Sequence, residues 1–222
     1  MTPGPGPAGT PRYPPWAADS EAVTQLVLRE RQSRDQGWWD RWSDCFEHDS
    51  VVDLSWFTGS GAEFVRLTRL RSADGAWGRH RLSPPAVQVN GDRARAELPL
   101  GIEFRISVGG IEADLVSYCR SQYRAQRREG TWRISRITSI YERDQITAAV
   151  PGTTLPLDPA AFAALRPSYR CLAWYLGQSG SDVGPDLLGD DAPDAVAHHY
   201  QAERAWLDDT TATMADNPSK EH

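Results

Sequence analysis

The stretch SRDQGWWDRWSDCFEHDSVVDLSWF, residues 33–57, contains the change from helical to strand pattern that decides the fold. A first helix should begin near Asp19, a good N-cap, and end near Gly37. Residues 51–57 are β-branched and aromatic, and they predict the first strand. Between them, three aromatic residues have the i, i+3, i+7 spacing of a short amphipathic helix: Trp39, Trp42 and Phe46.

The rest of the pattern adds one more helix and then strands. A capping box over residues 60–63, SGAE, should open a third helix that extends to about Leu70. From His80 onward, strand patterns alternate with tight-turn signals at Asn90-Gly91, Gly109-Gly110 and Glu129-Gly130. We therefore expect an α+β fold, in which three N-terminal helices pack in a strongly curved, mixed or antiparallel sheet.

The domain organisation follows from composition along the 222 residues. Residues 1–18 are rich in proline and glycine and predict a disordered tail. Residues 19–150 form the main α+β domain. Residues 151–208 predict a C-terminal helical extension that is too small for its own core, so it should pack on the domain or on a partner subunit. Residues 209–222 predict a second disordered tail.

The composition argues against several classes of partner. The formal net charge is −6, so a nucleic-acid backbone would be repelled overall. No apolar run approaches the roughly 18–20 residues that span a bilayer, and the N-terminus lacks the pattern of a signal peptide. Cys45, Cys119 and Cys171 form no CxxC pair, so we expect reduced thiols in a cytoplasmic protein.

Four segments, in this order, resemble the SnoaL-like branch of the nuclear transport factor 2-like superfamily. They are residues 33–57, GAEFV at 61–65, HRLSPPAVQVNGDRARAEL at 80–98, and GTWRISRITSIYERD at 130–144. The resemblance implies a cone-shaped α+β barrel with a pocket at its wide mouth. This fold hosts dehydratases, isomerases, cyclases, epoxide hydrolases and non-catalytic binders, so the function has to be argued from the site.

The resemblance also implies a catalytic pair. In dehydratases of that family, including scytalone dehydratase and bile-acid dehydratases, an aspartate on a helix and a histidine on a strand work together. Asp35, at the end of the first helix, matches the aspartate, and His80, in His-Arg-Leu-Ser-Pro, matches the histidine. The alternative is structural: Asp35 would pair with Arg34 or Arg41, and His80 would be an ordinary edge residue.

The two residue types suit proton transfer without a metal or a cofactor. A histidine, with an intrinsic pKa of about 6.5, can take a proton from a carbon next to a carbonyl and return it to a departing hydroxyl. The aspartate can hold one ring nitrogen and stabilise the imidazolium. No spacing of histidines, cysteines or acids predicts a metal site, because His198 and His199 are adjacent and do not share a helix face.

Further side chains are candidates to line the pocket. Strand alternation places Asp114 and Tyr118 on one face, and Arg105 is a candidate from the neighbouring strand; the alternative for these three is a solvated face with cross-strand salt bridges. Ser55 and Trp56 should point to opposite faces of one strand, so at most one of them lines the pocket. The candidate substrate-binding residues are Trp39, Trp42, Ser55, Trp56, Phe64, Arg105, Asp114 and Tyr118.

Two functional hypotheses follow. The first is a cofactor-independent acid/base enzyme, a dehydratase, isomerase or cyclase of secondary or steroid-like metabolism, which acts on a small apolar hydroxyl or carbonyl compound. In it His80 is the general base and acid, and Asp35 is its partner. The second is a non-catalytic small-molecule-binding or assembly module, in which these two side chains do not converge. The resemblance further implies a homodimer, or alternatively a trimer, formed through the outer face of the sheet.

Overall fold

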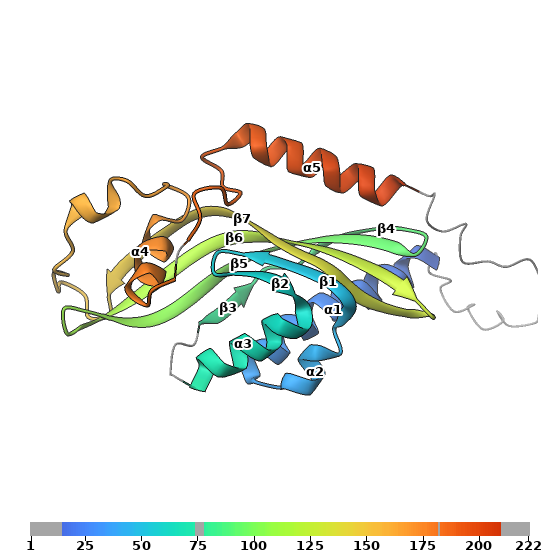
Figure 1. Cartoon of the computed structure of the whole chain (residues 1–222), viewed down its shortest axis with the longest axis horizontal. Coiled ribbons are helices and arrows are strands. Elements are labelled where there is room, and N and C mark those ends of the chain that lie inside the picture. Colours follow the sequence, from blue (N-terminus) through green and yellow to red (C-terminus); the bar gives the residue numbers. More distant parts are fainter. Residues whose placement is uncertain (1–14, 74–77, 182, 210–222) are drawn as a thin grey trace, which may run out of the picture.

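A long, curved sheet of seven strands forms the centre of the molecule (Figure 1). The computed structural model describes residues 15–73, 78–181 and 183–209. The strand order is β2-β1-β7-β6-β5-β3, and β4 also pairs with β5. All pairs are antiparallel except β1 with β7, so the sheet is mixed. The predicted α+β class and curved sheet are confirmed, but among the described residues the sheet stays open and does not close into a barrel.

Three of the strands are long enough to run the length of the molecule. Tight turns at the predicted sites connect β4 to β5, β5 to β6, and β6 to β7. In the first of these turns Gly91 has a φ of +58°, a conformation that favours glycine. The strands are β1 (Phe46–Leu54), β2 (Phe57–Ser60), β3 (Arg79–Leu82), β4 (Ala86–Asn90), β5 (Arg93–Val108), β6 (Ile111–Arg128) and β7 (Thr131–Ala148).

Strand β5 continues without a break past a proline, Pro99. Pro99 lies where the partner along this edge changes from β4, which pairs as far as Glu97, to β3, which starts pairing at Leu100. A proline has no N–H to donate, and it is tolerated here because neither ladder needs one at this position. Its carbonyl is used, since it accepts the backbone N–H of Ser83 at 2.9 Å.

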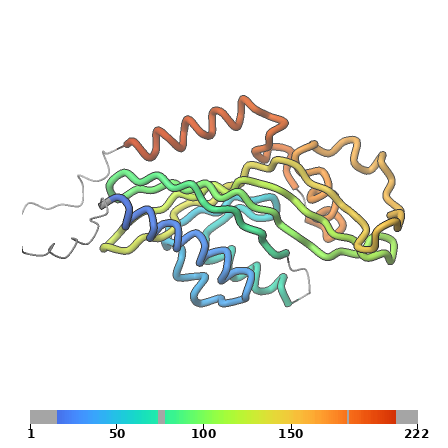
Figure 2. Tube along the Cα trace, turned by 180° about the vertical axis from the view of Figure 1, so that it is seen from behind, coloured from blue at the N-terminus to red at the C-terminus, as the bar shows by residue number. Residues whose placement is uncertain are grey.

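Helices cover both faces of the sheet. The helices α1, α2 and α3 lie on one face, and α5 lies on the opposite face, as two views from opposite sides show (Figures 1 and 2). The helical elements are α1 (Pro15–Gln36), α2 (Trp39–Ser43), α3 (Gly61–Ala73), a single 3₁₀ turn (Pro159–Phe162), α4 (Arg170–Gln178) and α5 (Pro193–Asp208).

The start of α3 agrees with the prediction, its end lies at Ala73 beyond the predicted Leu70, and the start of α1 differs. At α3 the capping box forms, because the backbone N–H of Glu63 donates to Ser60 Oγ at 3.2 Å. Helix α1 begins at Pro15, four residues before the predicted cap. Asp19 instead ties α1 to the β6–β7 hairpin, where its Oδ1 accepts from Arg127 at 2.6 Å and from the Trp132 indole at 3.1 Å.

The chain after β7 returns to the domain twice. Helix α4 packs against β6 and β7, where Leu172 and Leu176 are buried. Helix α5 crosses the other face and is held there by Glu203, whose carboxylate accepts two hydrogen bonds from Arg124 at 2.8 Å. The first helical part of the predicted extension is only the short 3₁₀ turn. Most of the two predicted tails, residues 1–14 and 210–222, lies outside the described residues.

Candidate active site

Asp35 and His80 converge, although 45 positions separate them in the chain. Asp35 lies in the last turn of α1, and His80 lies on the short edge strand β3. The Asp35 carboxylate makes two contacts: Oδ1 lies 2.7 Å from Nδ1 of the His80 ring, and Oδ2 accepts the His80 backbone N–H at 2.7 Å. One carboxylate therefore fixes both the strand edge and the orientation of the ring.

The protonation of the pair follows from its surroundings. Burial by itself raises the pKa of Asp35, but hydrogen bonds from His80 and the charge of Arg34 outweigh it and hold the pKa at about 2. An ionised carboxylate can only accept, so Nδ1 carries the ring proton and Nε2 is the acceptor, with NH1 of Arg31 3.4 Å from it. Burial, followed by the charge of Arg34, lowers the pKa of His80 to about 3. The ring is therefore neutral at pH 7.

Two arginines of α1 flank the histidine. Arg34 donates to Asp35 Oδ1 at 3.1 Å and to the carbonyl of Gly78 at 3.3 Å. Arg31 lies deeper, with its NH1 3.4 Å from His80 Nε2. Because both arginines carry a positive charge, they oppose protonation of the imidazole between them.

Glu30 compensates the charge of Arg31 inside the core. The Glu30 side chain is fully buried and forms a two-pronged ion pair with Arg31. It also accepts hydrogen bonds from the Trp42 indole at 2.8 Å and from the Tyr123 hydroxyl at 3.2 Å. Sequence reasoning missed the role of Glu30 and Arg31. The signal was a glutamate on the apolar face of the first helix, where a charge needs a partner.

The pair adjoins an apolar inner cavity of about 40 Å³ that opens beside a larger vestibule of about 390 Å³. The two share Arg34, Trp56, Phe104 and Leu176 in their linings. The vestibule lies within the roughly 300–1,000 Å³ typical of small-molecule sites. Around His80 the inner cavity is lined by apolar residues (Leu54, Leu100, Ile102, Leu172) and by four hydroxyl-bearing ones (Ser55, Ser121, Ser139, Tyr141).

Three of the eight predicted pocket residues line the inner cavity: Ser55, Trp56 and Phe64. The prediction that at most one of Ser55 and Trp56 does so is wrong. It assumed one strand over residues 51–57, whereas these two residues form the turn between β1 and β2, where strand alternation does not apply. Phe64 enters from α3, packed edge-on against Trp42 with ring centroids 5.1 Å apart.

Two predicted residues, Trp39 and Trp42, belong to the core instead. Trp42 is fully buried, and its indole N–H is occupied by Glu30. Trp39 packs against it with ring centroids 6.1 Å apart. Neither tryptophan lines the inner cavity or the vestibule, so these two predictions are wrong, and the core alternative for them is correct.

The three predicted residues Arg105, Asp114 and Tyr118 lie on the other face of the sheet. Arg105 is exposed and pairs across β5 and β6 with Asp114 at 2.7 Å, which is the salt-bridge alternative. The ring of Tyr118 lies under Arg143. The inner face of β6 is made by the alternate residues, including Leu115 and Cys119, which are buried. The prediction of pocket contacts for these three residues is therefore wrong.

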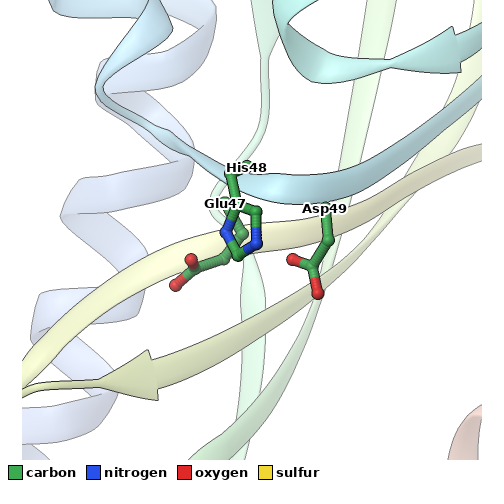
Figure 3. A group of neighbouring side chains, drawn as sticks. All are labelled: Glu47, His48 and Asp49. Carbon is green, nitrogen blue, oxygen red and sulfur yellow. The ribbon is translucent and has the colours of Figure 1, made fainter.

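Among the described residues, one group brings a histidine and two carboxylates close together: Glu47, His48 and Asp49 on β1 (Figure 3). Their ligand atoms lie within 4.8 Å of one another. Arg128 already compensates the two acids, since its NH1 lies 2.9 Å from Asp49 and 3.6 Å from Glu47. None of the three residues lines the inner cavity or the vestibule. The group therefore stands apart from the Asp35–His80 pair.

An open cone of curved sheet and three helices, with a polar pair beside an apolar cavity, defines the class as the nuclear transport factor 2-like superfamily. Within it, this chain belongs to the SnoaL-like domain family, whose family model matches residues 16–138. Among the described residues, none of the helices is both long and apolar enough to cross a membrane.

Known proteins similar to this chain include one curated relative and several solved structures. "Pea pathogenicity protein 2" of Fusarium vanettenii is 29% identical over 181 residues, which cover 77% of each chain. A hexachlorocyclohexane dehydrochlorinase, LinA type 2, has a TM-score of 0.54 at 14% identity, over 62% of this chain and 97% of that one, and this likeness shows the fold alone. An NTF2-like protein from Novosphingobium aromaticivorans has a TM-score of 0.46 at 24% identity, over 56% and 82%.

Proposed function

We propose that this protein is a cofactor-independent acid/base enzyme that removes a proton from a carbon atom of a small, largely apolar hydroxyl or carbonyl compound. The supporting observation is the 2.7 Å contact between Asp35 and His80 beside an apolar cavity. Dehydration, isomerisation and cyclisation all begin with such a proton transfer. The binding-module hypothesis predicted that the two side chains would lie apart, so their convergence favours the enzyme.

The proposed mechanism uses the two ring nitrogens of His80 differently. Nε2 takes the proton from the substrate carbon, and the C–H electrons form a double bond or an enolate. Asp35 stays ionised and stabilises the imidazolium through Nδ1–H. In a dehydration the imidazolium then gives its proton to the departing hydroxyl. The Tyr141 hydroxyl accepts the backbone N–H of Ser55 at 3.0 Å, which leaves its own proton to bind a substrate oxygen.

The comparisons support this proposal in a limited way. The name of the dehydrochlorinase, which has the same fold, describes an elimination. We extend elimination to this chain as a proposal, because the identity of 14% supports the fold alone. The name of the fungal relative specifies no reaction.

Deuterium uptake from D₂O tests the proton transfer without knowledge of the natural substrate. The purified chain is incubated with 1-tetralone and 3-hydroxyindan-1-one, and mass spectrometry follows exchange at the carbon next to the carbonyl. We expect His80→Ala and Asp35→Asn each to lower the exchange rate at least about 100-fold. The matched control is His199→Ala, which removes a histidine of α5 on the opposite face and should leave the rate unchanged. Full exchange by the His80 variant would refute the proposal.

A second candidate function is a non-catalytic small-molecule-binding module. The observation in its favour is that Arg31 lies 3.4 Å from Nε2, the atom that would act as the base. A histidine whose pKa is lowered to about 3 is also a weak base. This reading predicts that the same ketones bind without any enzyme-dependent deuterium uptake.

We also propose a homodimer, with a trimer as the alternative. Helix α5 lies over the outer face of the sheet, so a partner that approaches there would meet α5 and the strands beside it (Figure 1). Size-exclusion chromatography with light scattering tests this directly. A mass of one chain at micromolar concentration would contradict it.

A further inference from the structure

Among the described residues, the charged side chains that line the vestibule and the inner cavity are cationic. Together their linings contain three arginines, Arg31, Arg34 and Arg71, and no described aspartate or glutamate. Two of these arginines form ion pairs with carboxylates of α1: Arg31 with Glu30, and Arg34 with Asp35. The third, Arg71, forms no ion pair among the described residues.

Arg71 lies on α3 and is held in place by neutral groups. Its guanidinium stacks over the Trp56 ring at 4.6 Å, and its NH2 donates to Ser181 Oγ at 2.8 Å. Among the described residues, no carboxylate lies within ion-pair distance of it, whereas Arg66 on the same helix lies 3.6 Å from Glu63. A cation that is positioned but not neutralised can bind an anionic ligand.

Two polar atoms beside Arg71 also have no partner in the protein. Thr68 is 5% exposed and lines the vestibule one helical turn before Arg71, and its hydroxyl makes no hydrogen bond. The Nε of Arg34 is buried and likewise has no partner. Both atoms lie inside the wall with almost no accessible surface, so Arg71 is the group that can meet an oxygen-bearing ligand in the vestibule.

The remaining wall is aromatic. Trp56, Phe104 and Tyr175 line the vestibule, and the rings of Phe104 and Tyr175 lie 5.3 Å apart. Such surfaces bind flat rings through stacking and edge contacts. The vestibule therefore combines an aromatic surface with a cationic, donor-rich corner.

We propose that the vestibule binds an aromatic carboxylate, with the ring against the aromatic wall and the carboxylate on Arg71. The aromatic carboxylate as a substrate class rests on the proposed function, because this binding mode places an attached carbon chain toward His80. The vestibule as a binding site for such an anion does not require that any reaction is catalysed. An anionic aromatic compound is thus a narrower ligand than the small, apolar one that the sequence predicts.

A matched pair of ligands isolates the charge. Isothermal titration calorimetry at pH 7 compares 2-naphthoate with 2-naphthamide, which has nearly the same shape but no charge. We expect the wild-type chain to bind 2-naphthoate at least about tenfold more tightly, as a desolvated carboxylate–arginine pair would require. Equal affinities, or binding of neither compound at millimolar concentration, would overturn the inference.

Three variants locate the effect. Arg71→Gln should abolish the preference for 2-naphthoate and leave 2-naphthamide binding unchanged, and Arg71→Lys should retain most of the preference. The control is Arg66→Gln on the exposed face of α3, where neither affinity should change. A full preference in Arg71→Gln would show that the charge acts elsewhere and would refute the assignment.

The outcome is separable from that of the proposed function. His80→Ala should abolish deuterium uptake but keep the preference for 2-naphthoate. Selective binding without any exchange in the wild-type chain would support the anion site and refute the enzyme. Deuterium exchange without a preference for 2-naphthoate would support the enzyme and refute the anion site.

Discussion

Each face of the sheet has its own carboxylate–histidine pair, and only one of the two is built like an active site. On the inner face, Asp35 and His80 come from different elements, meet at 2.7 Å and border a cavity. On the outer face, His199 and Glu203 are one helical turn apart on α5, with 3.9 Å between Nε2 and Oε1. Glu203 makes its hydrogen bonds to Arg124, and His199 lines neither the vestibule nor the inner cavity.

The difference shows that the residue pair alone does not define a site. Asp35 binds the ring at Nδ1 and so directs Nε2 away from itself. Glu203 holds α5 to β6 through an arginine, so its carboxylate is occupied by a structural contact. What distinguishes the inner pair is a fixed tautomer on a ring that borders space a ligand can fill. The following predictions test this contrast, beginning with the largest expected effect.

The two buried carboxylates should differ in their contribution to stability. Glu30→Ala leaves the buried Arg31 without a partner, and we expect it to lower the free energy of unfolding by about 3–5 kcal/mol. Glu203→Ala should lower it by only about 1–2 kcal/mol, because the Arg124 side chain is 22% exposed and can turn to water. Urea denaturation followed by tryptophan fluorescence measures both. Equal losses would contradict the contrast.

Protonation of His80 at acid pH should destabilise the fold more than protonation of His199. Its folded-state pKa of about 3 lies below the ordinary 6.5, so the unfolded chain binds the proton first and stability falls as the pH drops from about 6.5 toward 3. His80→Asn should remove about 2 kcal/mol of the stability lost between pH 7 and pH 4.5. His199→Asn should remove less, because burial lowers the pKa of His199 but the charge of Glu203 opposes this. Urea denaturation at pH 7 and pH 4.5 measures the free energy of unfolding of the wild type and of each variant, and so tests this difference.

The contact between α5 and the sheet should matter for stability and not for ligand binding. Trp206 lies between Arg93 and Arg124, whose guanidinium carbons are 5.3 Å and 4.7 Å from its ring. Trp206→Ala should lower the free energy of unfolding by about 1 kcal/mol. Affinity for 2-naphthoate should stay within twofold of wild type by calorimetry. A loss of affinity would connect the outer face to the site and weaken the contrast.

The smallest effect should come from Arg105, which forms its ion pair on the outer face. Its side chain is 57% exposed, and so is much of its partner Asp114. Arg105→Ala should change the free energy of unfolding by less than about 0.5 kcal/mol. Ligand affinity and deuterium uptake should be unchanged. An effect on either would restore Arg105 as a pocket residue.

The sequence was sufficient for the order of helices and strands, because glycine turns and a capping box mark their ends locally. It also indicated Asp35 and His80, through the resemblance. It failed on β6, where alternation correctly separated Asp114 and Tyr118 from Leu115 and Cys119 but could not say which set faces inward. A polar residue looked like a pocket group there, whereas the structure uses it on the solvated face.

Two further parts of the site were beyond local pattern. The predicted helical extension over residues 151–208 included α4, but its pattern did not indicate that Leu172 and Leu176 would border the inner cavity beside His80. The strand pattern of residues 51–57 concealed the turn at Ser55 and Trp56, since both residue types occur in strands. In both cases the missing information is the position of another element, which only the tertiary structure supplies.

The contribution of α4 to the cavity wall has a consequence for biosynthesis. Asp35 and His80 leave the ribosome early, but the wall that encloses their hollow is encoded by residues 170–178, in the last quarter of the chain. A nascent or prematurely terminated polypeptide thus contains Asp35 and His80 but lacks the part of the cavity wall that α4 contributes. A ligand that fills the proposed site would therefore stabilise full-length molecules and leave truncated ones unprotected.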